Sequence, residues 1–242
     1  MTEASEQFVT YEVRDNIAHV QLDHGKANTL SSAVVAQLDA ALDRAEKAGP
    51  DKVGALILTG TPGFLTGGFD LEEMKADPKT AGNLVCNGGA LCTRMYGSPV
   101  PIVIACPGHA IAAGALMLLS ADERIGVSGT FKLGLIETQI GMVLPRWAIE
   151  LGQERLSKRH QQSAMTGGRN YSPEDAKAIG FLDDVVAPEE LERRAIEAAK
   201  YWAGLPRSAY IGQVKMIRGE RLRRLEAAVA ADRGAGFTAA TP

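Results

Sequence analysis

One carboxylate in the sequence stands in surroundings that favour acid–base chemistry. Glu137 is flanked by the apolar residues Leu135, Ile136 and Ile140. Burial among such side chains disfavours the charged form of a carboxyl group, which raises its pKa and makes it a usable general base near neutral pH. The alternative is a surface or helix-capping glutamate. We take Glu137 as the candidate base.

Two stretches rich in small residues are suited to presenting backbone N–H groups to a ligand. Residues 60–71 follow an apolar run, and residues 107–122 lie between an apolar strand at 101–105 and an apolar helix. The N–H groups of a helix's first turn have no partner within the helix, and the helix dipole adds partial positive charge there. Such a corner suits an anion or a developing oxyanion. Tight-turn packing is the alternative for both stretches.

The carboxylate and the two turns together favour one type of reaction. Two N–H donors aimed at one oxygen would stabilise an enolate, and a nearby carboxylate would remove the proton. The combination suggests proton abstraction next to a thioester carbonyl.

The elements expected around these residues alternate between strand and helix. A hairpin at 8–13 and 17–22 precedes a helix that starts at Ser31 or Ser32 and ends at Gly49. Further strands are expected at 53–59, 101–105 and 123–128. This order indicates an α/β fold with a largely parallel sheet, whose binding crevice forms from the loops after the strands. We expect residues 60–71 to be a loop, and residues 78–97 to be a helix after a mobile loop.

The second half of the chain is predicted to be mainly helical. Ser172 and Pro173 form a strong helix start, and Gly180 ends that helix. A helix is also expected at 145–151 and a strand at 181–186. Helical sequence then runs from Pro188 to about residue 231, with a break at 204–208.

Composition limits the kinds of partner. The 242 residues are 45% hydrophobic and 23% charged, which suits one large core with a modest appendage. The net charge of −3 favours neither nucleic acid nor an anionic membrane as a partner. No apolar run approaches the ~18 residues of a membrane span. Residues 1–7 lack the features of a signal peptide, so we expect a cytoplasmic location.

The cysteines give no sign of a metal site. Cys86, Cys92 and Cys106 follow neither metal-ligand spacing nor a disulfide framework, and they suit a reducing compartment. We expect them to be small buried side chains, and we expect no bound metal.

Three motifs resemble those of the crotonase (enoyl-CoA hydratase/isomerase) superfamily, and the resemblance covers nearly the whole chain. Leu65-Thr-Gly-Gly-Phe-Asp-Leu71 is similar to the turn F-S-A-G-x-D-L, with Gly67 where alanine is usual. Residues 107–114, with Asp122 closing the stretch, resemble N-G-x-A-x-G-G-G followed by a helix and a C-D pair. Asn28-Thr-Leu30 resembles the N-x-L that precedes the first helix.

The resemblance implies an architecture and a ligand. It implies a spiral of βα (ββα) units over residues 1–190, carrying the CoA and acyl sites. A C-terminal helical region, residues 191–242, would serve trimerisation and cover the pocket. The implied assembly is a homotrimer or a dimer of trimers. The implied ligand is an acyl-CoA, with coenzyme A entering as part of the substrate and no separate cofactor.

The resemblance also assigns site residues. It places the oxyanion donors at the N–H groups of Gly67 and Ala113. Asp70 is expected to be a structural partner of nearby backbone, and His109 to be structural or pocket-lining. Lys26 and Ala27 match the segment that lines the adenine end of CoA. The remaining expected substrate contacts are Leu65, Gly68, Phe69, Gly114, Leu116, Met142 and Trp147. The basic stretch from Lys215 to Arg224 either reaches CoA phosphates or is a solvated helix face.

One departure from the family pattern bears on the reaction. Hydratases of the family use two glutamates, and the first of these positions is Leu116 here. Glu137 remains, in Ile-Glu-Thr-Gln-Ile-Gly, which is similar to the N-E-T-Q-L-G of mitochondrial-type Δ3,Δ2-enoyl-CoA isomerases. Those isomerases likewise have leucine at the first position. The resemblance therefore implies an enzyme that converts 3-enoyl-CoA to 2-enoyl-CoA.

Two alternatives remain at this stage. The first is a hydratase (a lyase) or a thioester hydrolase that recruits Asp70, His109 or Glu150 as a second acid. The second is a CoA-binding protein without turnover.

Overall fold

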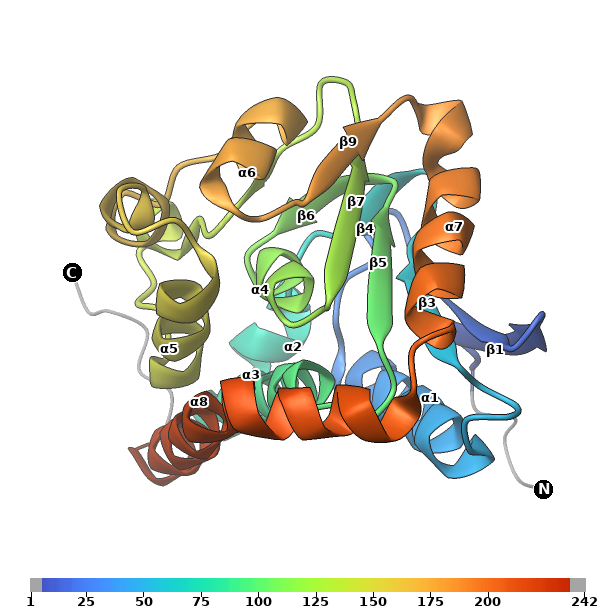
Figure 1. Cartoon of the computed structure of the whole chain (residues 1–242). Helices are drawn as coiled ribbons and strands as arrows, with labels where there is room; N and C mark the ends of the chain where they lie inside the picture. Colours follow the sequence, from blue (N-terminus) through green and yellow to red (C-terminus); the bar gives the residue numbers. More distant parts are fainter. Residues whose placement is uncertain (1–5, 236–242) are drawn as a thin grey trace.

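A six-stranded sheet forms the centre of the molecule (Figure 1). The computed structural model describes residues 6–235. Only the first pair of strands is antiparallel, and all the other neighbours in the sheet are parallel. The predicted hairpin and the predicted parallel sheet are therefore confirmed. In sheet order the strands are β1 (Val9–Arg14), β2 (Ile17–Leu22), β3 (Ala55–Thr59), β5 (Ile102–Cys106), β7 (Glu123–Val127) and β9 (Asp184–Val186).

A second, three-stranded parallel sheet lies in segments for which the sequence predicted no strand. Its strands are β4 (Gly63–Thr66), β6 (Gly108–Ile111) and β8 (Leu133–Gly134). The prediction that residues 60–71 form a loop throughout is thus wrong. Short glycine-containing strands look like turns in sequence, and only the pairing of distant segments makes them strands. A Cβ at Gly108 would collide with the carbonyl oxygen of Gly63, so glycine is needed for the two strands to meet.

The helices next to the pocket side of the sheet start at side-chain caps. Helix α1 (Ser32–Ala48) begins at Ser31, whose hydroxyl accepts the N–H of Val34. Helix α2 (Leu71–Ala76) is capped by Asp70. Helix α3 (Pro78–Tyr96) is capped by Asp77 and follows α2 directly, so the mobile loop expected before it is absent.

The remaining elements follow the predicted order. Ser172 caps α6 and Gly180 ends it in a left-handed conformation, as predicted. The break expected at 204–208 separates the last two helices. The helices not yet given bounds are α4 (Ala113–Leu119), η1 (Glu137–Ile140), α5 (Arg146–Arg155), η2 (Gln162–Thr166), α6 (Pro173–Ile179), η3 (Pro188–Glu190), α7 (Leu191–Ala203) and α8 (Arg207–Ala235).

Each face of the large sheet has its own core. Helix α7 packs on one face of the sheet, and most of the remaining helices contribute to the core on the opposite face (Figure 1). The small side chains of Ala195 and Ala198 lie in the second core together with Ile57 and Val103. Helices α7 and α8, within residues 191–235, therefore share cores with the sheet.

Three sequence expectations concern the cysteines, membrane-spanning helices and metal sites. All three cysteines are buried and unpaired, as expected. Over residues 6–235, no helix combines the length and apolarity needed to cross a bilayer. Within the same residues, no three side chains of His, Cys, Asp or Glu are grouped to hold a metal ion.

Helix α8 is anchored to the sheet through one buried carboxylate. The side chain of Asp122 is fully buried and forms an ion pair with Arg218 at 2.7 Å. It also accepts the N–H of Ile102 at 2.8 Å and the hydroxyl of Tyr210 at 3.1 Å. Further along the basic stretch, Arg221 pairs with Glu150 and Glu154. Much of that stretch is thus paired within the chain.

Removing this carboxylate charge is expected to destabilise the fold strongly. Asp122→Asn leaves Arg218 buried without a counter-charge, and we expect a loss of about 3 to 5 kcal/mol in the free energy of unfolding. Denaturant titration measures it. The matched control is Arg224→Ala, which breaks an exposed pair with Glu220 and should cost no more than about 1 kcal/mol. Equal effects of the two substitutions would contradict the anchoring role.

Candidate active site

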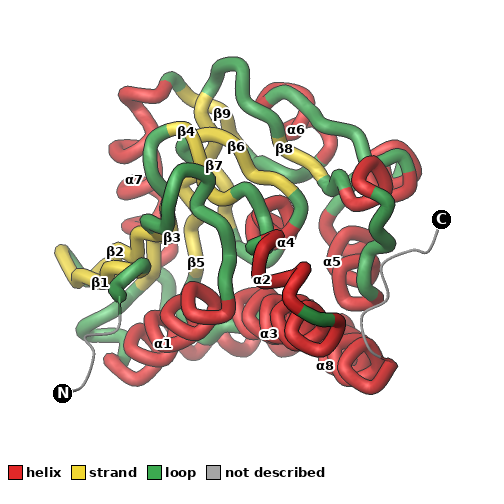
Figure 2. The backbone as a smooth tube through the Cα atoms, turned by 180° about the vertical axis from the view of Figure 1, so that it is seen from behind, coloured by secondary structure: helices red, strands yellow, loops and turns green. Residues whose placement is uncertain are grey.

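A pocket lined almost entirely by apolar side chains is formed by residues on and next to α2, α3, α4 and α5. Figure 2 shows how the backbones of these helices are arranged. Its volume is about 140 Å³. Phe69 lines it from the turn before α2, Leu116 from α4 and Trp147 from α5. Glu137, in η1, is the one titratable side chain among the described lining residues. The predicted base therefore sits in an apolar pocket.

The surroundings of Glu137 favour its protonated form. The residue is only 8% exposed, and its Oε2 has no hydrogen-bond partner within residues 6–235. Burial raises the pKa of Glu137 to about 7. This is the environment that the sequence predicted, and it is unlike that of a surface or capping glutamate. A carboxyl group with this pKa can both accept and return a proton near neutral pH.

The two small-residue turns meet beside the pocket. A Cβ at Gly68 would lie 3.0 Å from the carbonyl oxygen of Ile111 and 3.2 Å from Cβ of Ala112. Gly68 also has a positive φ of 101°. At the other turn, a Cβ at Gly114 would lie 2.7 Å from the carbonyl oxygen of Thr66. Glycine at both positions lets the two turns approach each other closely beside the pocket.

The second turn leaves the N–H groups at the start of α4 without acceptors within residues 6–235. Ala113 is the first residue of α4, and its N–H meets no acceptor in the part of the chain that the structure describes. The preceding residue, Ala112, has φ 53° and ψ −117°, a conformation that costs a residue with a side chain about 1 to 3 kcal/mol. The turn holds this strained backbone directly beside the pocket.

In the first turn, the prediction that Gly67 is an oxyanion donor is wrong. The N–H of Gly67 already donates to the carbonyl oxygen of Ala27 at 2.8 Å, so it is not available to a ligand. Phe69, two residues later, forms a parallel bridge with Leu30. In that bridge Leu30 donates to Gly68 and accepts from Asp70, so the N–H of Phe69 points away from Leu30. It has no acceptor within residues 6–235.

The position of this donor does not follow from simple strand alternation. The N–H groups of both Gly67 and Asp70 donate to residues 27–30, and Gly68, whose φ is 101°, breaks the alternation between them. Sequence comparison alone identified the turn but not its pairing partner.

Asp70 has a structural role. One of its carboxylate oxygens accepts the N–H groups of Glu72 and Glu73, and the other accepts the hydroxyl of Thr29. These hydrogen bonds, led by the one from Glu73, hold the pKa of Asp70 below its usual value. Asp70 is thus a helix cap, as the sequence analysis favoured.

His109 and Leu65 do not line the pocket, contrary to the predicted substrate contacts. The Nδ1 atom of His109 accepts the N–H of Lys132 at 3.0 Å, and its ring packs against Phe64 and Phe131. Leu65 is fully buried in the core. Both side chains were expected at the site because their neighbours in sequence are there, but strand alternation points them elsewhere.

The other predicted contacts divide by location. Leu116, Met142, Trp147 and Phe69 line the pocket. Gly68 and Gly114 act through the close approach described above. Lys26 is exposed, and Ala27 contacts Gly67 through its carbonyl oxygen. Contact of Lys26 and Ala27 with CoA stays a prediction.

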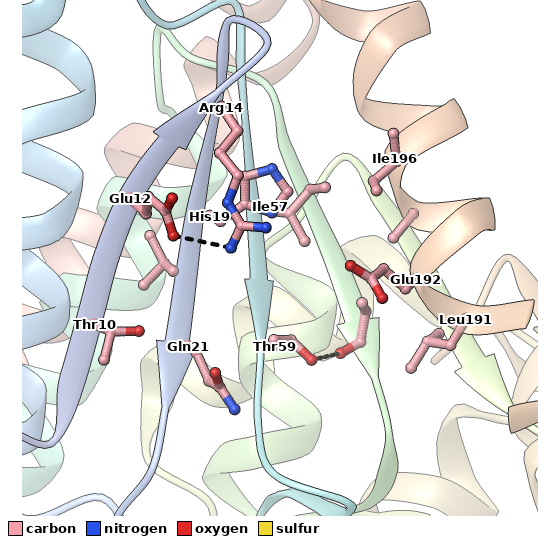
Figure 3. A pocket seen from close by; sticks show the side chains of 13 residues that line it. Thr10, Glu12, Arg14, His19, Gln21, Ile57, Thr59, Leu191, Glu192 and Ile196 are labelled. Carbon is pink, nitrogen blue, oxygen red and sulfur yellow. Dashed lines mark hydrogen bonds and ion pairs between the residues drawn. The ribbon is translucent and has the colours of Figure 1, made fainter. Parts of the chain in front are cut away.

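Another concavity lies on the opposite face of the large sheet, between β1, β2, β3 and α7 (Figure 3). Its lining is more polar, with Glu12, Arg14 and His19 among the labelled side chains. Glu12 and Arg14 form an exposed ion pair at 2.9 Å. Glu192 also lines the concavity and is exposed, as Glu12 is, so neither acid is buried as Glu137 is.

Comparison with known proteins agrees with this fold and site. A family model described as enoyl-CoA hydratase/isomerase matches residues 12–236, and the chain belongs to this family. A curated relative, the human mitochondrial enoyl-CoA delta isomerase 1, is 28% identical over 213 residues, covering 86% of this chain and 70% of the relative. The fold is that of the crotonase-type proteins, as the resemblance implied.

Two solved structures are closely similar. A Pseudomonas syringae enoyl-CoA hydratase/isomerase family protein is 42% identical with a TM-score of 0.90, and 94% of this chain and 97% of that chain are covered. An enoyl-CoA isomerase of Mycobacterium tuberculosis is 34% identical with a TM-score of 0.88, covering 94% and 98%. Another structure of the M. tuberculosis protein carries the name probable enoyl-CoA hydratase. The names therefore establish the family but not the choice between the two reactions.

The burial of Glu137 is expected to make stability depend on pH. Its pKa is about 7 when folded and has an ordinary value of 4.5, so between these values the folded state holds a proton that the unfolded state has lost. Stability contributed by this group therefore falls as the pH rises from 4.5 to 7. Glu137→Gln is expected to raise the free energy of unfolding at pH 8 by up to about 3 kcal/mol.

Urea unfolding at pH 8 and pH 4.5 measures this effect. The gain should be much smaller at pH 4.5, where Glu137 is protonated in the folded protein. Glu150→Gln is the control, because Glu150 is paired with Arg221 outside the pocket. A Glu137→Gln effect that is equal at both pH values would contradict the assigned burial.

Proposed function

We propose that this protein is an enoyl-CoA isomerase that converts a 3-enoyl-CoA to a 2-enoyl-CoA. The observation that carries the proposal is a single buried carboxylate, Glu137, in a pocket where Leu116 stands at the position of the first hydratase glutamate. Moving a double bond requires one group that removes a proton and returns it. One carboxylate with a pKa of about 7 meets that requirement.

The proposed reaction uses two backbone donors and one side chain. The thioester oxygen accepts hydrogen bonds from the N–H groups of Phe69 and Ala113. Glu137 removes a proton from C2, and the negative charge that develops on the thioester oxygen is stabilised by the two donors. The carboxyl group then delivers the proton to C4, which leaves the double bond between C2 and C3. No atom is gained or lost overall.

Hydration requires chemistry that this pocket lacks. Adding water needs one group to activate the water and a second to manage the proton delivered to C2. Leu116 is 1% exposed and apolar, and it supplies neither. The candidate second acids are engaged elsewhere, since Asp70 caps α2 and Glu150 pairs with Arg221. His109, whose Nδ1 accepts the N–H of Lys132, also lies outside the pocket.

The assembly, the ligand and the location belong to the same proposal. An acyl-CoA would bring coenzyme A as part of the substrate, so no separate cofactor is needed. We expect a homotrimer or a dimer of trimers, with the exposed side chains of Met216 and Ile217 on α8 available for association. A cytoplasmic location stays a prediction, and the human relative named above is mitochondrial.

The direct test supplies purified protein with a 3-enoyl-CoA and, separately, with a 2-enoyl-CoA. We expect conversion of the first and no hydration of the second. Glu137→Gln should lower the isomerisation rate by about 10² to 10⁴ while acyl-CoA binding is retained. Glu150→Gln is the matched control and should keep its rate. Hydration at an enzymatic rate would overturn the isomerase, and binding without either reaction would favour the non-catalytic alternative.

The pH profile gives an independent test of the base. Because Glu137 must be ionised to remove the proton and its pKa is about 7, kcat/KM should fall as the pH drops through about 7. Steady-state rates from pH 5 to 9 measure this limb. Rates that stay level from pH 9 down to about pH 5 would show that the base is a solvated group with the ordinary carboxylate pKa of 4.5 and not Glu137.

A further inference from the structure

Two aromatic walls of the pocket rest against consecutive glycines of α3. A Cβ at Gly88 would lie 2.5 Å from Cε1 of Phe69 and closer still to Cζ. A Cβ at Gly89 would lie 2.7 Å from Nε1 of Trp147 and 2.8 Å from two of its ring carbons. Both distances are far below ordinary van der Waals contact. Neither ring could occupy its present position beside a residue with a side chain.

Helix stability does not account for these two residues. Gly88 and Gly89 are buried in the interior of a 19-residue helix, where glycine is less favourable than alanine. The adjoining Leu84, Val85 and Leu91 have the side chains expected of a helix face in a core. Gly88 and Gly89 differ from those residues in that they leave room for the rings of Phe69 and Trp147.

The ring of Phe69, not its backbone, would yield to a side chain at position 88. The backbone on either side of Phe69 is fixed by the hydrogen bonds of Gly68 and Asp70 to Leu30. Restoring van der Waals contact with a new methyl group would require the ring to move by about 1 Å. The ring lines the pocket, so displacement from the helix moves it into the space for the acyl group.

The indole ring of Trp147 is held by packing alone. It is fully buried, and its Nε1 has no hydrogen-bond partner within residues 6–235. No polar contact would hold the indole in place if a methyl group were added at position 89. Its displacement would likewise narrow the pocket.

We propose that Gly88 and Gly89 determine which acyl chains the pocket accepts, by letting the rings of Phe69 and Trp147 lie back against α3. This inference rests on the proposed function only in that the pocket holds an acyl group. The glycines are positioning residues, since they act through the two rings. Acyl chains long enough to reach the rings depend on them, whereas short chains do not.

The test measures binding of saturated butanoyl-, hexanoyl-, octanoyl- and decanoyl-CoA by calorimetry. For Gly88→Ala and Gly89→Ala we expect decanoyl-CoA to bind about tenfold more weakly and butanoyl-CoA to change by less than about twofold. The matched control is Gly212→Ala on α8, because a Cβ there would meet nothing within 4 Å. It should leave the whole series unchanged.

Second-site variants separate the proposed role from a general packing defect. Phe69→Leu should restore decanoyl-CoA binding to Gly88→Ala, and Trp147→Phe should restore it to Gly89→Ala. A loss of affinity that is uniform over all chain lengths would overturn the proposal. So would a loss of decanoyl-CoA binding that Phe69→Leu or Trp147→Phe does not relieve. If an alanine variant does not fold, Phe69→Leu and Trp147→Phe alone decide. Each should shift the preference toward longer chains, and an unchanged preference would overturn the proposal.

Failure of this inference can be told from failure of the proposed function. Saturated thioesters bind without turnover, so the series can be measured whether or not the protein isomerises a 3-enoyl-CoA. An active isomerase whose variants bind all chain lengths alike would overturn only the role of the glycines.

Discussion

The close approach of two strand-to-helix turns is the constraint on which the site depends. Gly68 and Gly114 leave no Cβ where the backbone of the other turn lies, and Gly108 does the same for strands β4 and β6. Beside the apolar pocket, the two turns include the N–H groups of Phe69 and Ala113, which have no acceptor within residues 6–235. The strained backbone of Ala112 is a local cost of this arrangement.

Burial of Glu137 links stability to the proposed chemistry. Water that would solvate the carboxylate is excluded by the same apolar side chains that line the pocket, and this raises its pKa into the neutral range. A buried carboxyl group without a partner lowers the stability of the fold when it ionises. The side chain of Asp122 is also buried but differs from Glu137, because it pairs with Arg218 at 2.7 Å.

The pocket is shaped by residues that carry no reactive group. Phe69 contributes a backbone donor through its N–H and a wall through its ring, and the position of that ring depends on Gly88 in a different element. Helix α3 thus contributes to the proposed site mainly through missing side chains. Such a contribution has no chemical signature in the sequence, which is why the motif-based analysis did not single out Gly88 and Gly89.

The sequence by itself indicated the family through the resemblance of three motifs. It also predicted the order of the main elements and the candidate base, because these depend on local patterns: apolar periodicity, helix caps and an acid among apolar neighbours. The hairpin, the start of α6 and the burial of Glu137 were all predictable in this way. Only the tertiary structure decided that residues 63–66 and 108–111 pair as strands, and that the free donor is at Phe69 and not at Gly67. Those outcomes depend on which distant segment lies alongside, and for Gly67 the pairing with Ala27 uses the N–H that the motif had suggested was free.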